Sequence, residues 1–210
     1  MKWLSTSLLL SKITALFQDA HKAEKEEIRS TFEKYNEALL QDQGEEAVKY
    51  VDSRTLKYYS TALVKVIHAD ADAIESMSIL DKLMVLIIRH RASREEILSF
   101  DGRSLFIYAV EKGMAGKNSI PNNSLGRIKV VGDFARARAL SRGRRTPVHY
   151  HFYQEAGKWK IDLTSVFPAT APAFKKLIEK SGQEENEFIF LILEMITGKK
   201  PGPEVWEKLE

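Results

Sequence analysis

The segment PVHYHFYQ carries the side chains best suited to chemistry in this chain of 210 residues. If the segment is a strand, its side chains alternate between two faces, so His149 and His151 share one face and Tyr150 lies on the other. A histidine titrates near neutral pH and can act as a general base or as a polar anchor in a pocket. The pair could also share a metal ion with His68 or Asp162, but the sequence does not place a third ligand, so we expect no metal and no other cofactor.

Asp162 is the acidic candidate that would complete an acid–base site with a histidine and a tyrosine. Around it, Trp159, Ile161 and Leu163 form an apolar set, and Asp162 lies on the opposite face of a regular strand. The alternative interpretation is an outward-facing aspartate that pairs with a lysine such as Lys160. Whichever face of the histidine strand joins the apolar set is the interior face, and the sequence leaves that choice open.

Arg136 and Arg138 share one face of the segment DFARARALSR, and alanines occupy the other face. Guanidinium groups suit planar anions, so the two arginines are candidates for binding a carboxylate or a phosphate. The alternative is a solvated outer face, with the alanines letting a helix come close. The surrounding sequence is also basic, through Arg127, Lys129, Arg144 and Arg145. Because no groove with interleaved aromatic residues can be identified, we do not expect a nucleic-acid partner.

The composition excludes several function classes. There is no cysteine, hence no thiolate metal site and no cysteine nucleophile, which fits a reducing compartment and leads us to expect a cytoplasmic protein. The formal charge is only +3, from 32 basic and 29 acidic residues, so any electrostatic recognition must be local. No phosphate loop, dinucleotide fingerprint, nucleophile elbow or zinc-protease motif is present.

The apolar segments are too short to cross a membrane. WLSTSLLL, near the N-terminus, is diluted by serine and threonine and soon interrupted by Lys12, so it indicates a docking helix more than a secretory signal. EFIFLILEMI is flanked by charge and indicates a buried helix. We therefore expect no transmembrane segment.

Apolar residues at intervals of three and four predict helices in the first half of the chain. The first two helices are expected over 24–44 and 45–51, and a third begins at a cap, Asp52 or Ser53. A fourth begins at a cap, Asp70 or Asp72, and continues through the apolar segment SILDKLMVLIIRH. A fifth runs from a capping box at Ser93 and Glu96 to Asp101-Gly102, and a sixth covers SLFIYAVEKG.

Beyond Gly116 a turn-rich segment leads to strand-like patterns over 126–131, 134–142, 147–154 and 158–165, and two helices follow Pro168 and Pro172. The connections between these strands are short, so neighbours should pair antiparallel. The predicted class is α+β in a single domain, 1–210, with an N-terminal helical appendage over 1–23, a core over 24–165 and a helical tail over 169–210.

Two segments resemble a known family. EEIRSTFEKYNEALLQDQGEEAVKYVDSRTLKYY is similar to the opening of nuclear transport factor 2-like (SnoaL-like) proteins, and EAGKWKIDLTS is similar to their final hairpin. The resemblance implies a bent antiparallel sheet, the cystatin-like cone, packed by N-terminal helices around a cavity. The chain departs from a compact member through extra helices over 73–113 and at the C-terminus.

The resemblance implies a non-catalytic module that binds an apolar or anionic small molecule or a protein, and that forms a homodimer through its sheet. Tyr59, Tyr150 and Trp159, with Arg136 and Arg138, are then the candidate ligand-binding residues. One alternative is a cofactor-independent isomerase, lyase or hydrolase in which His149 or His151 works with Asp162 and a tyrosine. Another is an immunity or accessory protein that blocks a partner. The sequence favours a binding module over an enzyme and leaves both interpretations open.

Overall fold

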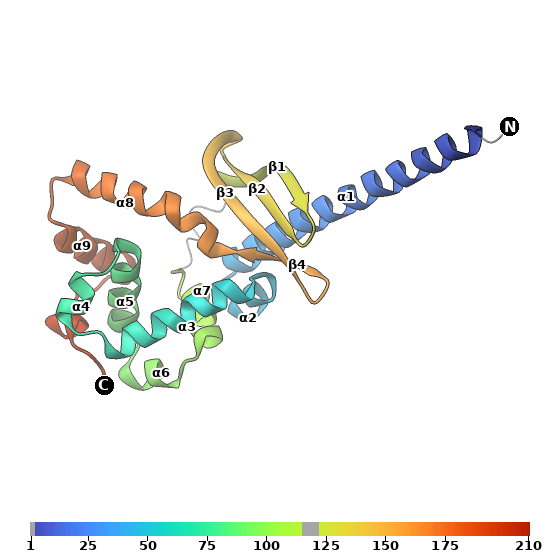
Figure 1. Cartoon of the computed structure of the whole chain (residues 1–210). Coiled ribbons are helices and arrows are strands. Elements are labelled where there is room, and N and C mark those ends of the chain that lie inside the picture. The colour runs from blue at the N-terminus through green and yellow to red at the C-terminus, as the bar shows by residue number, and fades with distance from the viewer. Residues whose placement is uncertain (1–2, 115–121) are drawn as a thin grey trace.

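The computed structural model describes residues 3–114 and 122–210. The predicted α+β class is confirmed, because helices precede and follow one four-stranded antiparallel sheet (Figure 1). Within these two ranges no helix combines the length and the apolar character needed to cross a membrane. Residues 115–121, where the sequence predicts turns, lie outside the described residues.

Helices form most of the chain before the sheet, and the N-terminal part of the first one extends away from the rest (Figure 1). They are α1 (Trp3–Leu40), α2 (Gly44–Ala47), the 3₁₀ helix η1 (Val48–Tyr50), α3 (Ser53–His68), α4 (Ala71–Glu75), α5 (Ile79–Arg91), α6 (Arg94–Ser99) and α7 (Gly102–Glu111). Those after the sheet are the 3₁₀ helix η3 (Leu163–Val166), α8 (Phe167–Ser181), α9 (Glu185–Thr197) and the 3₁₀ helix η4 (Pro203–Trp206).

The sheet is a meander in the order β1-β2-β3-β4, as the short connections predicted. Its strands are β1 (Asn123–Val131), β2 (Phe134–Ser141), β3 (Arg144–Glu155) and β4 (Lys158–Asp162). The turn between β3 and β4 has positive φ at both Ala156 (50°) and Gly157 (73°), the geometry that matches the twist of a tight hairpin. Strand β3 is visibly curved (Figure 1).

The strand register identifies the interior face of the sheet. Phe152 on β3 lies opposite Ile161 on β4 and opposite Ala135 on β2, and all three side chains are buried. Helix α1 packs on this face, where the ring of Phe32 meets the ring of Tyr150 at 5.0 Å between centroids. The face that carries His149 and His151 is therefore the outer one.

Local sequence signals identified several helix starts correctly. Asp52 caps α3 and Asp70 caps α4, each through its carboxylate. Ser93 and Glu96 form the predicted capping box at α6. The apolar segment around α5 is buried, as its composition predicted.

Two helix boundaries were predicted wrongly. The helix expected to continue from Asp70 or Asp72 is split into α4 and α5, because Ser78 starts a new helix by accepting a hydrogen bond from the backbone of Asp81. Asp101 was expected to end a helix, whereas it caps the start of α7. Gly102 then lets α7 approach α3 closely, since a Cβ there would lie 2.7 Å from the carbonyl oxygen of Leu56.

The predicted last strand, over 158–165, is too long. Strand β4 ends at Asp162, whose carboxylate accepts hydrogen bonds from the backbone (2.9 Å) and hydroxyl (2.6 Å) of Thr164 and turns the chain into η3. Helix α8 starts at Phe167 and so contains both prolines that were expected to precede it. Pro168 lies in the first turn, where a missing N–H costs nothing, and Pro172 lies inside the helix.

Helix α9 is less buried than its apolar sequence predicted. Only Ile189 and Leu193 are buried, whereas Leu191 is 41% exposed and Met195 is 73% exposed. The helix lies at the edge of the fold against α5 and α8, so much of its apolar surface faces outward.

Both ends of α9 are bonded to α5. Lys82 on α5, only 3% exposed, forms ion pairs with Glu185 (2.8 Å) at the start of α9 and with Glu75 (2.9 Å) on α4. Burial lowers the pKa of Lys82, but the hydrogen bonds with the two glutamates outweigh it, so the pKa is raised and the charge is kept. At the other end, Nε2 of His90 lies 2.9 Å from the hydroxyl of Thr197.

We expect Lys82→Ala to lower the free energy of unfolding by about 1–3 kcal/mol, because it removes a buried cation while leaving two half-exposed carboxylates near each other. Lys65→Ala is the matched control, since Lys65 is 34% exposed in its pair with Asp81, and the pair should contribute only about 0–1 kcal/mol. Urea denaturation of both variants measures the difference. Equal losses would show that the bonds of Lys82 do not hold α9 in place.

Candidate functional site

A cavity of about 470 Å³ lies between the helices and the inner face of the sheet. This volume falls in the range of small-molecule sites, about 300–1,000 Å³. The walls come mainly from six elements of the chain. They include Phe32, Tyr35, Asn36 and Leu39 of α1, Thr55, Tyr58 and Tyr59 of α3, Leu80, Leu83, Met84 and Ile87 of α5, Tyr150 of β3, Phe167, Thr170 and Phe174 of α8, and Ile192 and Ile196 of α9.

The cavity lining is apolar and uncharged. Among the described residues that line it there is no aspartate, glutamate, lysine, arginine or histidine. The polar groups are tyrosine and threonine hydroxyls and the side-chain amides of Asn36 and Asn123. Such a lining can enclose an apolar molecule and can hydrogen-bond one or two polar atoms of it.

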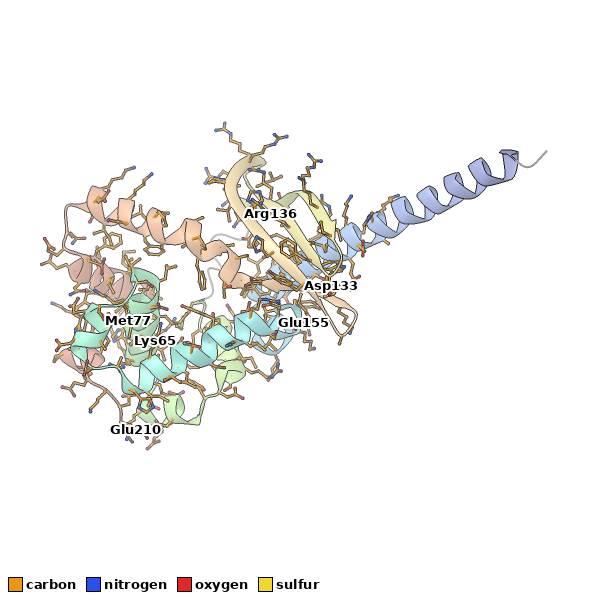
Figure 2. All side chains as sticks on the ribbon, in the orientation of Figure 1. Lys65, Met77, Asp133, Arg136, Glu155 and Glu210 are labelled. Atoms are coloured by element: carbon orange, nitrogen blue, oxygen red, sulfur yellow. The ribbon has the colours of Figure 1, made fainter. Side chains whose placement is uncertain are left out.

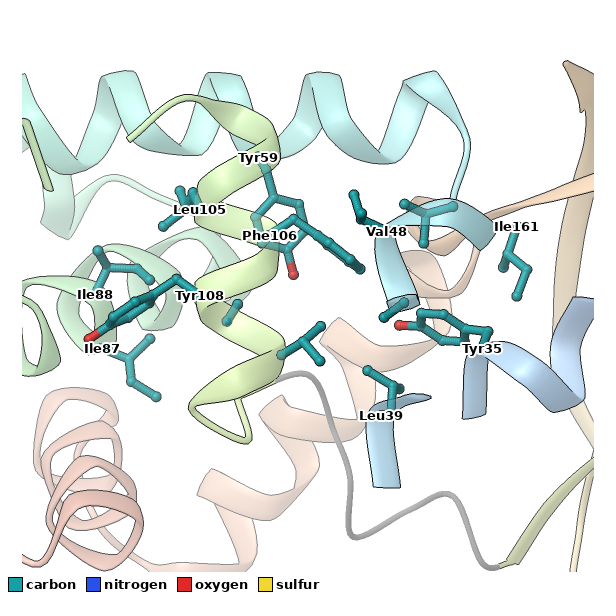
Figure 3. Close-up of a cluster of buried hydrophobic side chains, with 14 of the residues drawn as sticks. Tyr35, Leu39, Val48, Tyr59, Ile87, Ile88, Leu105, Phe106, Tyr108 and Ile161 are labelled. Atoms are coloured by element: carbon teal, nitrogen blue, oxygen red, sulfur yellow. The ribbon is translucent and has the colours of Figure 1, made fainter. Parts of the chain in front are cut away.

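Three tyrosines bring hydroxyl groups to the cavity. Tyr35 and Tyr59 enter the interior from α1 and α3, close to Phe106 (Figure 3), and Tyr150 enters from the sheet. Burial raises the pKa of Tyr59 to about 12 and also raises the pKa of Tyr150. The pKa of Tyr35 is raised well above its usual value, first by burial and then by Tyr59 and Tyr150. All three therefore stay protonated at neutral pH and can donate hydrogen bonds.

Aromatic contacts hold these tyrosines in place. The ring of Tyr59 meets the edge of Phe106 on α7 at 5.1 Å, and the ring of Tyr58 meets Phe167 at the start of α8 at 4.8 Å. For Tyr35, Tyr59 and Tyr150, no hydrogen bond to another described residue occupies the hydroxyl. These donors are thus available to a ligand.

Of the ligand-binding candidates that the sequence suggested, the structure places some at the cavity and others elsewhere. Tyr59 and Tyr150 line the cavity. Trp159 is 1% exposed and belongs to the packed core, not to the cavity lining, and its indole N–H has no partner among the described residues. The sequence did not identify the walls formed by α5, α8 and α9, because apolar helical spacing alone does not tell a packed face from a cavity wall.

Arg136 and Arg138 lie on the outer face of the sheet with both candidate histidines. Arg136 is opposite His151 in the register, and Arg138 is opposite His149. The backbone of the sheet thus separates these four side chains from the cavity lined by Tyr150.

Asp162 does not form an acid–base pair with a histidine. It is opposite His151 in the register and is 5% exposed, but its carboxylate is bonded to Thr164. In the described part of the chain no hydrogen bond joins the carboxylate to His151, whose ring instead packs against Phe134. The same ranges contain no cluster of three or more metal-binding side chains.

The environment of His149 is cationic. Its Nδ1 lies 3.0 Å from the guanidinium of Arg136 and 3.1 Å from the carbonyl oxygen of Pro147. Burial lowers the pKa of His149 most, the charges of Arg136 and Arg138 and a smaller effect of His151 lower it further, and the Pro147 carbonyl opposes them. The imidazole is therefore neutral at pH 7.

Comparison with known protein families, with curated proteins and with solved structures finds no match to this chain. The resemblance to nuclear transport factor 2-like proteins therefore stays a prediction from the sequence.

We expect Arg136→Gln to raise the pKa of His149 toward its ordinary value of 6.5, because a positive charge beside the ring disfavours its protonation. A pH titration of the imidazole proton resonances by NMR measures this change. Arg103→Gln is the matched control, since Arg103 pairs with Glu45 far along the chain from the sheet. An unchanged His149 titration in Arg136→Gln would contradict the cationic environment described above.

Proposed function

We propose that this protein is a non-catalytic binding module that holds an apolar small molecule, carrying one or two hydrogen-bond acceptors, in the cavity between the helices and the sheet. The observation that supports this most is the lining, which joins a large apolar surface to three protonated tyrosine hydroxyls without partners among the described residues. A ligand carbonyl or hydroxyl oxygen would accept hydrogen bonds from them.

Acid–base catalysis in the cavity has less support. A general acid or base must come within about 2.6–3.2 Å of the proton that it transfers. The residues proposed for that role, His149 and His151, lie across the sheet from the cavity, and the buried tyrosines have pKa values far above neutrality. A binding role fits these positions better than an isomerase, a lyase or a hydrolase.

The proposal includes membership of the nuclear transport factor 2-like class and a cytoplasmic location. A long helix packed across an antiparallel sheet, with a cavity between the sheet and the helices, agrees with the architecture implied by the resemblance. The lack of cysteine agrees with a reducing compartment.

Helix α8 is suited to admit the ligand. It forms one wall of the cavity, yet none of its side chains is buried, and Leu177 on it is 52% exposed. A helix with no fully buried side chain opens at a smaller cost in free energy than a core helix such as α3. We therefore propose that α8 opens to let the ligand in and closes over it.

Binding of a fluorescent fatty acid, cis-parinaric acid, tests the cavity directly. We expect the protein to bind it and Leu83→Trp to weaken binding at least about tenfold, because the indole would fill the space beside α5. Tyr150→Phe should weaken it by about two- to tenfold, the effect of one lost neutral hydrogen bond.

Val64→Trp is the control for this experiment, because Val64 is 58% exposed on α3 and does not line the cavity. It should bind the probe as the unaltered protein does. If Leu83→Trp, shown by its thermal melt to be folded, also binds normally, the cavity is not the site.

Hydrogen exchange tests the role of α8. Its backbone amides should exchange faster than those of α3 and α5 without ligand, since α8 has no buried side chain, and should become protected when the fatty acid is bound. Mass spectrometry of peptides over 167–181 measures both rates. Protection confined to α3 and α5 would contradict an opening motion of α8.

A further inference from the structure

The positive charge of this protein is concentrated on its sheet. Residues 123–160 contain nine lysines and arginines and only two acidic residues, a net charge of +7, whereas the whole chain has a net charge of +3. The remainder of the chain is therefore net acidic. A field of this kind, confined to one region, steers anionic partners toward that region.

The register brings aromatic rings into the same surface as the cations. Phe134 lies opposite Tyr153, two residues along from the Arg136–His151 pair, so all four side chains share the outer face. On the next strand Lys129 lies opposite Arg136. The sequence showed each strand's own alternation, but only the register unites them in a single surface, which we name the basic sheet face: Lys129, Phe134, Arg136, Arg138, His149, His151 and Tyr153.

The rings of the basic sheet face form a row across two strands. Phe134 meets Tyr153 at 5.1 Å and His151 at 5.2 Å between ring centroids, and all three are partly exposed. Arg54 of α3, which also pairs with the buried Asp52 (3.1 Å), places its guanidinium 3.5 Å from the centroid of Tyr153 at the border of the row. Rings with cations on either side are the arrangement that stacks bases while pairing with phosphates.

The two acidic residues of 123–160 lie at the ends of this surface, and Asp162, opposite His151, is buried with its carboxylate bonded to Thr164. Figure 2 shows Asp133 and Glu155 at the ends of the strands, away from Arg136. The carboxylate of Glu155 is also bonded to Ser53, since it accepts hydrogen bonds from the backbone (3.0 Å) and the hydroxyl (2.6 Å) of that residue. An anion on the basic sheet face would therefore meet cations and rings.

We propose that the basic sheet face binds single-stranded nucleic acid, with Phe134 stacking a base and with Lys129, Arg136 and Arg138 contacting the backbone phosphates. Exposed rings on adjacent strands of an antiparallel sheet suit unpaired bases, whose flat faces are accessible only in a single strand. This role is separate from the cavity and does not depend on its ligand.

Two other occupants of the same surface fit less well. A second copy packed face to face would bring the arginines of both copies together, and the like charges would repel. A membrane surface would need exposed aliphatic side chains to insert, and the exposed large apolar residue of this sheet is Val131 at its end.

Fluorescence anisotropy with labelled oligo(U) and oligo(dT) of about 12 nucleotides tests the proposal at about 50 mM salt. We expect micromolar or tighter binding that Lys129→Glu/Arg136→Glu weakens at least about tenfold, with a smaller salt dependence because fewer phosphates are neutralised. Lys175→Glu/Lys176→Glu on α8 is the matched control, since it makes the same charge change at exposed positions away from the sheet and should keep most of the affinity.

A second variant separates stacking from charge. Phe134→Leu keeps an apolar side chain of similar size but removes the ring, so it should weaken single-strand binding about fivefold or more without changing the salt dependence. Thermal melts confirm that each variant is folded.

Several results would overturn the proposal. They are an unaltered protein that does not bind the oligonucleotides, equal losses in the α8 control and the sheet variant, and a Phe134→Leu variant that binds as tightly as the original. Binding to phosphatidylserine vesicles but not to oligonucleotides would assign the surface to a membrane. A dimer in sedimentation that Lys129→Glu/Arg136→Glu dissociates would assign it to a second copy.

Discussion

The position of α3 against the sheet depends on one junction, where the start of α3 meets the end of β4. Val51 and Ile161 form a parallel β-bridge, and the backbone N–H of Asp52 donates a hydrogen bond to the carbonyl of Ile161 (2.9 Å). One turn into α3, the hydroxyl of Thr55 accepts a hydrogen bond from the backbone of Leu163 (2.9 Å). Because these bonds join α3 directly to the sheet, they set the width of the cavity between α3 and β3.

The junction has an electrostatic cost, because it buries the carboxylates of Asp52 and Asp162 near each other. Burial raises the pKa of Asp52, and the charge of Asp162 adds to the effect. The folded state therefore binds this proton more tightly than the unfolded chain does, so ionising Asp52 lowers stability as the pH rises above its ordinary pKa of 3.8. Hydrogen bonds from Thr55 and Arg54 to Asp52, and from Thr164 to Asp162, limit that loss.

Features set by residues close together in the sequence, such as helix caps, could be predicted. Features set by contacts between distant segments could not. The capping box of Ser93 and Glu96 depends on residues three apart, so the sequence was sufficient to find it. The interior face of the hairpin depends on the partner that covers it, so alternation alone could not assign His149 to the outside. The cavity was harder still, since α8 and α9 reach it from the far end of the chain and carry no local sign that they form its wall.

Strand β2 connects the packing of the fold with the charge of its surface. Ala135 and Ala137 are buried on the inner face, and Arg136 and Arg138 occupy the outer face. A register shift by one residue would bury the arginines and expose the alanines, so the pairing is strongly specified. The same alternation keeps the cavity uncharged and the opposite surface basic, with Tyr150 on β3 between two outward-facing histidines. An apolar ligand and an anionic partner would then bind on opposite sides of a single sheet, and any coupling between them must pass through the backbone of β3.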